Sequence, residues 1–347
     1  MKNIRFEIKF LPVLAVLGFT AFFGVSVLTS PLYPPSSSPN SGSGTRTQKP
    51  GLLQVVPDAP KSALTGTNLT GGLQVDQPIG VMIENYTPIR NTQKGVEDAA
   101  IVYESLTEGG ITRLLCIFSG EPVDSIGPVR SARPYFIDWA GEYKAAYTHV
   151  GGSFAALENL KTNPFLLNLD EFSDESVIWR SSLYLAPHNA FTSVSNVLRA
   201  MKEKGFFKPL ESPRFIFKKP APATPVVKLI NIPFSIDPYE VKWVYLPGEN
   251  SYARYNGGKP HGRIKAANIL VQFTEQETLD DIGRLRIQTL GTGRALIFND
   301  GKAIKGTWEK EDAQSFTRFF DEGGQEVPLN PGQTWVEVVP SGLPITY

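Results

Sequence analysis

The 347-residue sequence contains a single cysteine, Cys116, and only three histidines. One cysteine excludes an internal disulfide, a CxxC redox centre and a cysteine-rich zinc site. His149, His188 and His261 show neither HxH nor HExxH spacing, so no pattern indicates a metal site. We therefore expect no metal and no cofactor.

An excess of charge of one sign is also lacking, because 34 Lys and Arg residues balance 34 Asp and Glu residues. Proteins that bind nucleic acid normally carry a basic excess that displaces phosphate counterions, so we expect no nucleic-acid partner. What is present is a globular composition, with 41% hydrophobic and 20% charged residues. The 31 Gly and 28 Pro residues indicate many turns and therefore substantial β-structure.

The amino terminus contains a long apolar run, residues 10–28, that carries no charge and follows Lys2, Arg5 and Lys9. As a helix it would extend roughly 28 Å, close to the thickness of a hydrocarbon core. The preceding positive charges place the amino end in the cytoplasm. Residues 1–30 thus predict a single-pass anchor in the cell membrane, with the folded domains on the extracytoplasmic side. A signal peptide cleaved after Ser26 is the alternative.

The composition divides the rest of the chain into three parts. Residues 31–72 are rich in Pro, Ser, Gly and Thr and predict a flexible linker. Residues 73–217 alternate strand-like apolar runs with helices that begin after Ser131, Ser153 and Ser193, which predicts an α/β domain. After the Pro-rich stretch 218–225, residues 226–347 read mostly as antiparallel strands. The predicted fold class is α+β: a layered α/β domain followed by a mostly antiparallel β domain, preceded by a membrane anchor and a disordered linker.

Several long phrases of the sequence resemble one family. They are IGVMIENYTPIR at 79–90, AIVYESLTEGGITRLLCIF at 100–118, SIGPVRSARPYFIDWA at 125–140, THVGGS at 148–153, LAPHNAFTS at 185–193 and PGQTWVEVVP at 331–340. Together they resemble the YerB-like family of bacterial envelope lipoproteins, which carries paired amino- and carboxy-terminal domains of unknown function. The resemblance implies an exported protein held at the membrane and no established activity. The chain departs from the family by lacking a lipidated cysteine, which favours direct anchoring through residues 10–28.

Two loops carry the residue types of an anion site. Arg130 and Arg133 flank Ser131, the predicted helix cap, and a guanidinium can bind two oxygens of a carboxylate or phosphate at once. Gly151 and Gly152 allow a ligand to approach the backbone closely. The alternative is structural, in which the arginines pair with Glu104, Glu108 or Asp138 and hold the loop in place.

Catalysis is a second interpretation of the same loops. Ser153 can be a nucleophile with His188 as its base and Asp170 or Glu104 as the orienting group, although the motif is not GxSxG and helix capping by Ser153 is the plainer interpretation. Asn189 lies beside His188 and can orient its ring or bind a ligand. Asn85, Glu104, Gly151 and Ser153 all fall at the ends of predicted strands, where ligands gather in open α/β sheets, so we expect one common site.

We predict a non-catalytic protein that binds an anionic component of the cell envelope, or an acidic envelope protein, at a cleft formed by these loops. The alternatives are a hydrolase or transferase that acts on cell-wall polymer with His188 as acid/base, and a scaffold for other membrane proteins. The proposed catalytic residues are His188, Ser153 and Glu104, and the proposed ligand-binding residues are Asn85, Arg130, Ser131, Arg133, Gly151, Gly152 and Asn189.

Overall fold

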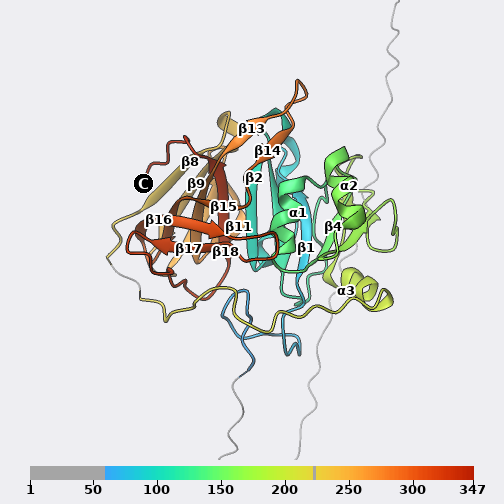
Figure 1. Ribbon diagram of the computed structural model, residues 1–347, viewed down its shortest axis with the longest axis horizontal. Coiled ribbons are helices and arrows are strands. Elements are labelled where there is room, and N and C mark those ends of the chain that lie inside the picture. Colours follow the sequence, from blue (N-terminus) through green and yellow to red (C-terminus); the bar gives the residue numbers. More distant parts are fainter. Residues whose placement is uncertain (1–58, 222–223) are drawn as a thin grey trace, which may run out of the picture. The chain divides into compact units, whose positions relative to one another are not determined.

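The computed structural model describes residues 59–221 and 224–347 (Figure 1). The predicted anchor or signal segment, residues 1–30, lies outside the described residues, as does the predicted linker up to residue 58. Among residues 59–221 and 224–347, none of the helices combines the length and the apolar character that a membrane crossing requires.

A ten-stranded mixed sheet runs through the described chain, and its strands come from both halves of the sequence. Their spatial order is β17 (Arg318–Asp321), β16 (Lys302–Lys310), β15 (Gly291–Asn299), β12 (Asn268–Thr274), β18 (Thr334–Pro340), β2 (Ile101–Leu106), β3 (Thr112–Phe118), β1 (Ile79–Glu84), β4 (Ala146–His149) and β5 (Leu167–Asp170).

The two halves meet where β18 pairs in parallel with β2, from Thr334 opposite Ile101 to Val338 opposite Ser105. The sheet therefore continues across the division that the composition placed at 218–225. Parallel pairing between strands more than two hundred positions apart leaves no local trace in the sequence. The apolar composition of β2 and β18 is nevertheless that of strands buried on both faces, and both are buried along nearly their whole length.

The smaller elements cover this sheet. A four-stranded antiparallel sheet has the order β11-β10-β9-β8, and the pairs β13–β14 and β6–β7 form two small ribbons. The bounds are β6 (Trp179–Arg180), β7 (Ala190–Phe191), β8 (Leu229–Pro233), β9 (Glu240–Leu246), β10 (Ser251–Asn256), β11 (Lys259–Ala266), β13 (Gln276–Thr278), β14 (Leu285–Ile287), the helices α1 (Pro134–Gly141), α2 (Phe154–Thr162) and α3 (Val194–Glu203), and the 3-10 turns η1 (Thr87–Thr92), η2 (Val96–Asp98), η3 (Glu108–Gly110) and η4 (Asp237–Tyr239).

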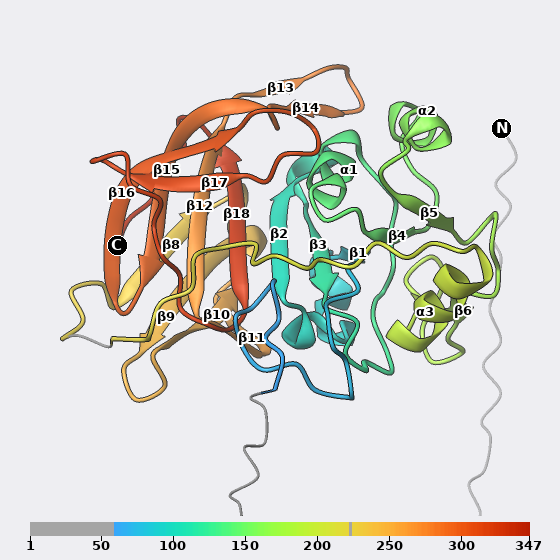
Figure 2. The same ribbon diagram turned by 60° about the horizontal axis from the view of Figure 1, so that its bottom comes forward.

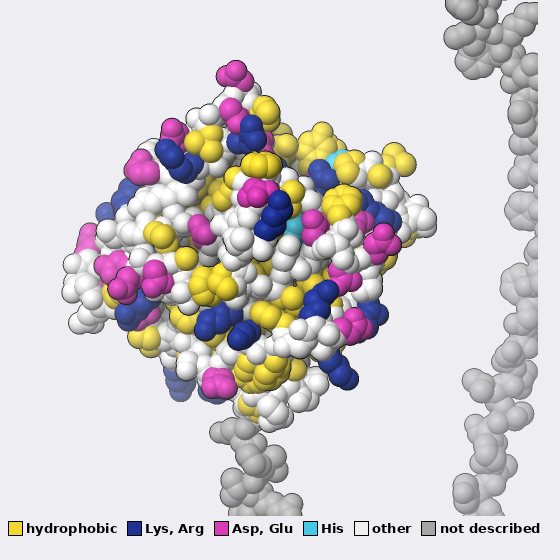
Figure 3. All heavy atoms as spheres, turned by 45° about the vertical axis from the view of Figure 1, so that its right-hand side comes forward, with side chains coloured by type: hydrophobic (Ala, Val, Ile, Leu, Met, Phe, Trp, Pro, Cys, Tyr) yellow, Lys and Arg dark blue, Asp and Glu magenta, His cyan; other side chains and the backbone are white. Residues whose placement is uncertain are grey.

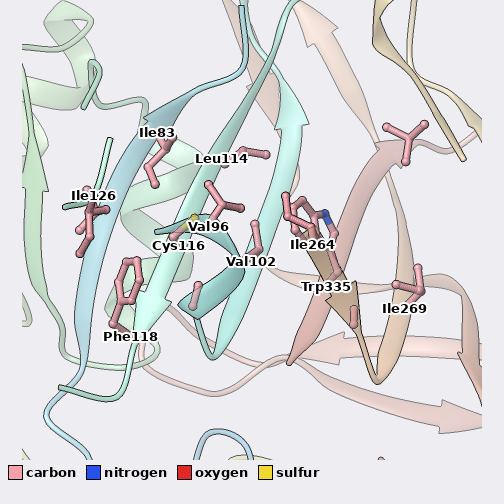
Figure 4. Packing of buried hydrophobic residues seen from close by; sticks show 14 of the residues in the cluster. Ile83, Val96, Val102, Leu114, Cys116, Phe118, Ile126, Ile264, Ile269 and Trp335 are labelled. Atoms are coloured by element: carbon pink, nitrogen blue, oxygen red, sulfur yellow. The ribbon is translucent and has the colours of Figure 1, made fainter. Parts of the chain in front are cut away.

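The large sheet has apolar side chains on both faces because each face is covered. One face carries α1 and α2, and its cluster includes Tyr103, Leu115, Phe136 and Trp139. The other face carries α3 and the four-stranded sheet, and Figure 4 shows part of its cluster, including Val102, Cys116 and Trp335. Figure 2 shows α1 and α3 on opposite sides of β3, β1 and β4. The few helices, the mixed sheet and the antiparallel sheets confirm the expected fold class at this coarse level.

Two boundaries differ from the predictions. Residues 59–72, which the composition assigned to the linker, are packed: Leu64 is buried in the cluster of the α1 face, and Ser62 donates to Asp76 at 2.7 Å. Helix α1 begins at Pro134 rather than after Ser131, because proline fits the first helical position and Arg133 occupies the cap. Ser153 caps α2 as predicted, accepting from the Ala156 amide at 3.3 Å.

Candidate functional site

Three loops converge at the carboxyl ends of β1 and β4, and we call residues 127–133, 149–153 and 185–190 the loop cluster. The amide of Arg130 donates to Met82 of β1 at 2.9 Å, and Val150 donates to Arg130 at 3.1 Å. Ala132 donates to Gly151 at 2.9 Å. These backbone bonds bring together the arginine loop, the glycine turn and the histidine loop, which are far apart in the sequence.

Glu84, the last residue of β1, joins two candidate residues of the loop cluster. Its Oε1 lies 3.1 Å from Nε of Arg130, and its Oε2 lies 2.8 Å from Nδ1 of His188. The Tyr86 ring stacks on the His188 ring with 5.7 Å between centroids. Because an ionised carboxylate only accepts, Nδ1 of His188 carries the proton. Within the described chain no group bonds to Nε2 of His188, which is left to face solvent or a ligand.

Arg133 is fully engaged with an acid. Its Nε and Nη2 each lie 2.7 Å from an oxygen of Glu108, which is the two-point geometry that Arg forms with carboxylates. Burial opposes ionisation of Glu108, but the hydrogen bond and charge of Arg133 outweigh it and lower the pKa of this carboxyl. For Arg133 the structural alternative of internal pairing therefore describes the contacts.

Arg113 of β3 adds a third guanidinium to the loop cluster. It lies opposite Glu84 in the sheet register and donates through Nη1 to the carbonyl of Ser131 at 2.8 Å. Burial and the neighbouring Arg133 lower the pKa of Arg113 to about 10, so it stays charged at neutral pH. In residues 59–347, gap excepted, no carboxylate lies within ion-pair distance of Arg113. The cluster thus holds three guanidiniums against the carboxylates of Glu84 and Glu108.

The glycine turn is held by internal hydrogen bonds. Gly151 has φ +58°, and its amide donates to Asp170 Oδ1 at 2.9 Å. The Ser153 hydroxyl is occupied as the cap of α2. Asn189 accepts from Arg180 Nη1 at 2.9 Å, so it bonds to the β6–β7 ribbon instead of the His188 ring.

Asn85 and Glu104 belong to the opposite face of the sheet. Asn85 Nδ2 donates to Glu104 Oε1 at 3.1 Å, and both side chains are buried. Side chains alternate between faces along a strand, so Glu84 faces the loop cluster while Glu104 faces the four-stranded sheet. The expectation of one common site is therefore corrected. Ser153, His188 and Glu104 are not hydrogen-bonded to one another in the part of the chain that the structure describes.

Glu104 belongs to what we call the buried network, which centres on Arg254 of β10. Arg254 Nη2 bonds to Glu104 of β2, and Nη1 lies 3.2 Å from Oε1 of Glu337 in β18. Trp243 Nε1 donates to the same Glu337 oxygen at 2.7 Å. Burial and the nearby Glu104 raise the pKa of Glu337 well above its ordinary value.

His261 links the buried network to the first half of the chain. Arg254 Nε donates to Nδ1 of His261 at 2.9 Å, and because a guanidinium cannot accept, this ring nitrogen must be unprotonated. Its Nε2 then donates to Gln93. Burial and the charges of Arg254 and Arg90 lower the pKa of His261 well below its ordinary value.

Comparison with known proteins agrees with this architecture. The two domains described as "Protein of unknown function (DUF3048)", amino-terminal and carboxy-terminal, match residues 64–207 and 230–336. A relative of 28% identity over 300 residues, "Putative lipoprotein YerB" of Bacillus subtilis (strain 168), aligns with 82% of this chain and 88% of its own length. The chain belongs to the YerB-like family. The crystal structure of the YerB protein from Bacillus subtilis, 26% identical, superimposes with a TM-score of 0.73 over 83% of this chain and 99% of that one.

Sequence reasoning missed most of the buried network of this YerB-like chain. A single acid inside an apolar strand, as Glu337 in TWVEVV, is the signal that was available, because an ionisable side chain on a buried strand needs a partner. Arg254 alternates with Tyr252 and Asn256 on the inward face of β10, and it carries the same signal.

Proposed function

We propose that this YerB-like chain is an envelope-associated protein that binds an anionic envelope polymer at the loop cluster. Two features place it at the envelope: the lipoprotein named among its relatives and the apolar segment 10–28 of its own sequence. The single observation that carries the binding site is the unequal charge count, in which three guanidiniums share two carboxylates. An uncompensated arginine near the surface attracts phosphate or carboxylate oxygens.

Access to the cluster supports the proposal. The side chains of Arg130 and His188 are about a quarter exposed, at 23% and 24%. Exposed apolar side chains surround them: Leu185 accepts the His188 amide hydrogen bond, and Phe154 follows Ser153 directly. Figure 3 brings the side of α2 and α3 forward and shows hydrophobic side chains beside a histidine and basic side chains. A polymer with apolar as well as anionic groups would contact both.

A binding assay with the full-length protein tests this function. The protein is sedimented with purified cell-wall material that retains its anionic polymers, and the double variant Arg113→Gln, Arg130→Gln is expected to bind at least tenfold more weakly. Salt should weaken binding of the parent protein, because the attraction is ionic. Arg286→Gln, which alters an exposed arginine of β14, is the matched control. Unchanged binding by a folded double variant would refute the proposal, and Arg130→Gln alone serves if the double variant does not fold.

His188 supports a second candidate, hydrolysis of the same polymers. With Nδ1 held by Glu84, the free Nε2 is oriented as a general base for water. Ser153 is occupied as a cap, so water rather than this serine would be the nucleophile in that reaction. Soluble fragments released from purified wall should appear with the parent protein and disappear with His188→Gln. Absence of release by the parent protein would leave binding as the function of the cluster.

A further inference from the structure

A pocket of about 920 Å³ lies on the other side of the molecule from α1, where the first half of the chain meets the β10–β11 hairpin. Its lining comes from η1, η2, η4 and residues 256–264. Arg90, Gln93 and His261 connect its floor to the buried network. None of the residues of the loop cluster lines it, so this pocket is separate from the site proposed above.

Asn256 gives the pocket an unsatisfied polar group. Its side chain is 3% exposed, and within the described chain neither its amide oxygen nor its amide nitrogen has a hydrogen-bond partner. Arg254, two residues earlier on the same face of β10, has every guanidinium nitrogen bonded. A buried amide left without partners costs folding free energy, so its partners are to be sought in whatever enters the pocket.

The position of Asn256 is fixed by the turn that follows it. Gly257 and Gly258 have φ +58° and +75°, as a two-residue hairpin of the primed type requires. A Cβ added to Gly257 would lie 2.9 Å from the carbonyl oxygen of Pro238, so the hairpin is tightly packed on η4. Asn256 pairs with Lys259 across the hairpin and with Val241 on its other side. The amide is therefore held in place before any ligand arrives.

The geometry of the amide selects a class of ligand. A side-chain amide presents one acceptor and one donor side by side. In an extended peptide the N–H and C=O of one residue point the same way, as they do in the hydrogen-bonded pairs of antiparallel sheets, and so match this arrangement. No aromatic side chain lines the pocket among the described residues, so a sugar ring would find no platform to stack on.

The charge of the lining narrows the class further. Glu97, Asp237 and Glu240 outnumber Arg90 and Lys259. Arg90 is already bonded to Asn85 at 2.8 Å and to the Pro238 carbonyl at 2.9 Å, so it has little capacity left for an anion. We propose that this pocket binds an extended, basic peptide segment, with the Asn256 amide paired to the backbone of one peptide residue. This ligand is opposite in charge to the one proposed for the loop cluster.

The test uses the full-length protein and three probes: acetyl-Ala-Lys-Ala-Lys-Ala-amide, its Glu counterpart, and the tetramer of N-acetylglucosamine. Calorimetry should show binding of the Lys peptide, weakened about tenfold or more by Asn256→Ala. Asn159→Ala, at an exposed amide of α2, is the matched control. The double variant Asp237→Asn, Glu240→Gln should bind the Lys and Glu peptides with equal affinity.

Thermal unfolding separates a ligand-binding role from a structural one. Because Asn256 makes no side-chain hydrogen bond within the described chain, Asn256→Ala should unfold within a few degrees of the parent protein. Equal affinity of the parent and Asn256→Ala for the Lys peptide would overturn the proposal. Tighter binding of the Glu peptide, binding of the tetrasaccharide alone, or no binding of any probe at millimolar concentration would overturn it as well.

Discussion

Glu84 and Asn85 are neighbours in the sequence, yet they serve two different assemblies on opposite faces of one sheet. Glu84 meets Arg130 and His188 in the loop cluster, where the two partners are about a quarter exposed. Asn85 leads into the buried network, where the side chains of Arg254, Glu104 and Glu337 are 0% exposed. The same residue types therefore have different consequences: charge near solvent can be exchanged for a ligand, whereas charge without solvent must be matched within the protein.

The largest expected effect follows from breaking the buried network at its centre. Arg254→Met leaves Glu104 and Glu337 facing each other without a counter-ion, and removing one partner of a buried pair typically costs about 3–5 kcal/mol. Urea unfolding of the two proteins measures the loss. The triple variant Arg254→Met, Glu104→Gln, Glu337→Gln should recover a large part of it, since no uncompensated charge remains. A loss for Arg254→Met as small as that of a surface pair would contradict the assignment.

The pH dependence of stability sharpens the comparison, because His261 and His188 lie on opposite faces. The pKa of His261 is depressed in the folded state, so below roughly 6.5, the ordinary histidine value, the unfolded chain binds more protons than the folded chain. Stability from His261 is therefore present above that pH and is lost as the pH falls. Its slope can reach about 1.4 kcal/mol per pH unit.

Glu337 acts with the opposite sign in an overlapping range. Its pKa is raised, so its folded form holds a proton that the unfolded chain releases above its ordinary pKa, and its contribution declines as the pH rises. The difference in unfolding free energy between the parent protein and His261→Gln isolates the histidine. That difference should shrink from pH 7 to pH 5. A difference that does not change with pH would contradict a neutral His261.

A smaller effect is expected in the loop cluster, at Arg133. Its side chain and that of Glu108 are 15% and 21% exposed, so solvent screens part of their attraction. We expect Arg133→Gln to cost about 1 kcal/mol in unfolding free energy, well below the effect of Arg254→Met. Because the pKa of Glu108 is lowered by Arg133, this stability is present above roughly pH 4.5 and is lost on acidification. Unfolding at pH 7 and pH 3 measures both, and an equal cost at the two pH values would contradict the pairing.

The contrast between the faces also explains how far the sequence could predict this molecule. Apolar runs located β1, β2 and β3, and hydroxyl caps located α2 and α3, because these are local signals. Local patterns indicate which residues end a strand, and so the residues of the loop cluster were named. They do not show which strand lies beside which. Glu104 meets Arg254 only because β10 packs over β2, a contact across 150 positions that no local pattern records.

The smallest expected effect concerns a pair that neither face contains, Arg286 and Glu277 on the β13–β14 ribbon. Their side chains are 69% and 57% exposed, and they face each other across the antiparallel register. Exposed pairs gain little, since water screens the attraction and two long side chains must be ordered. Arg286→Gln should change the unfolding free energy by under about 0.5 kcal/mol, as urea unfolding would show. A larger loss would mean that exposure does not set the strength of these ion pairs, and the distinction drawn between the two faces would fail with it.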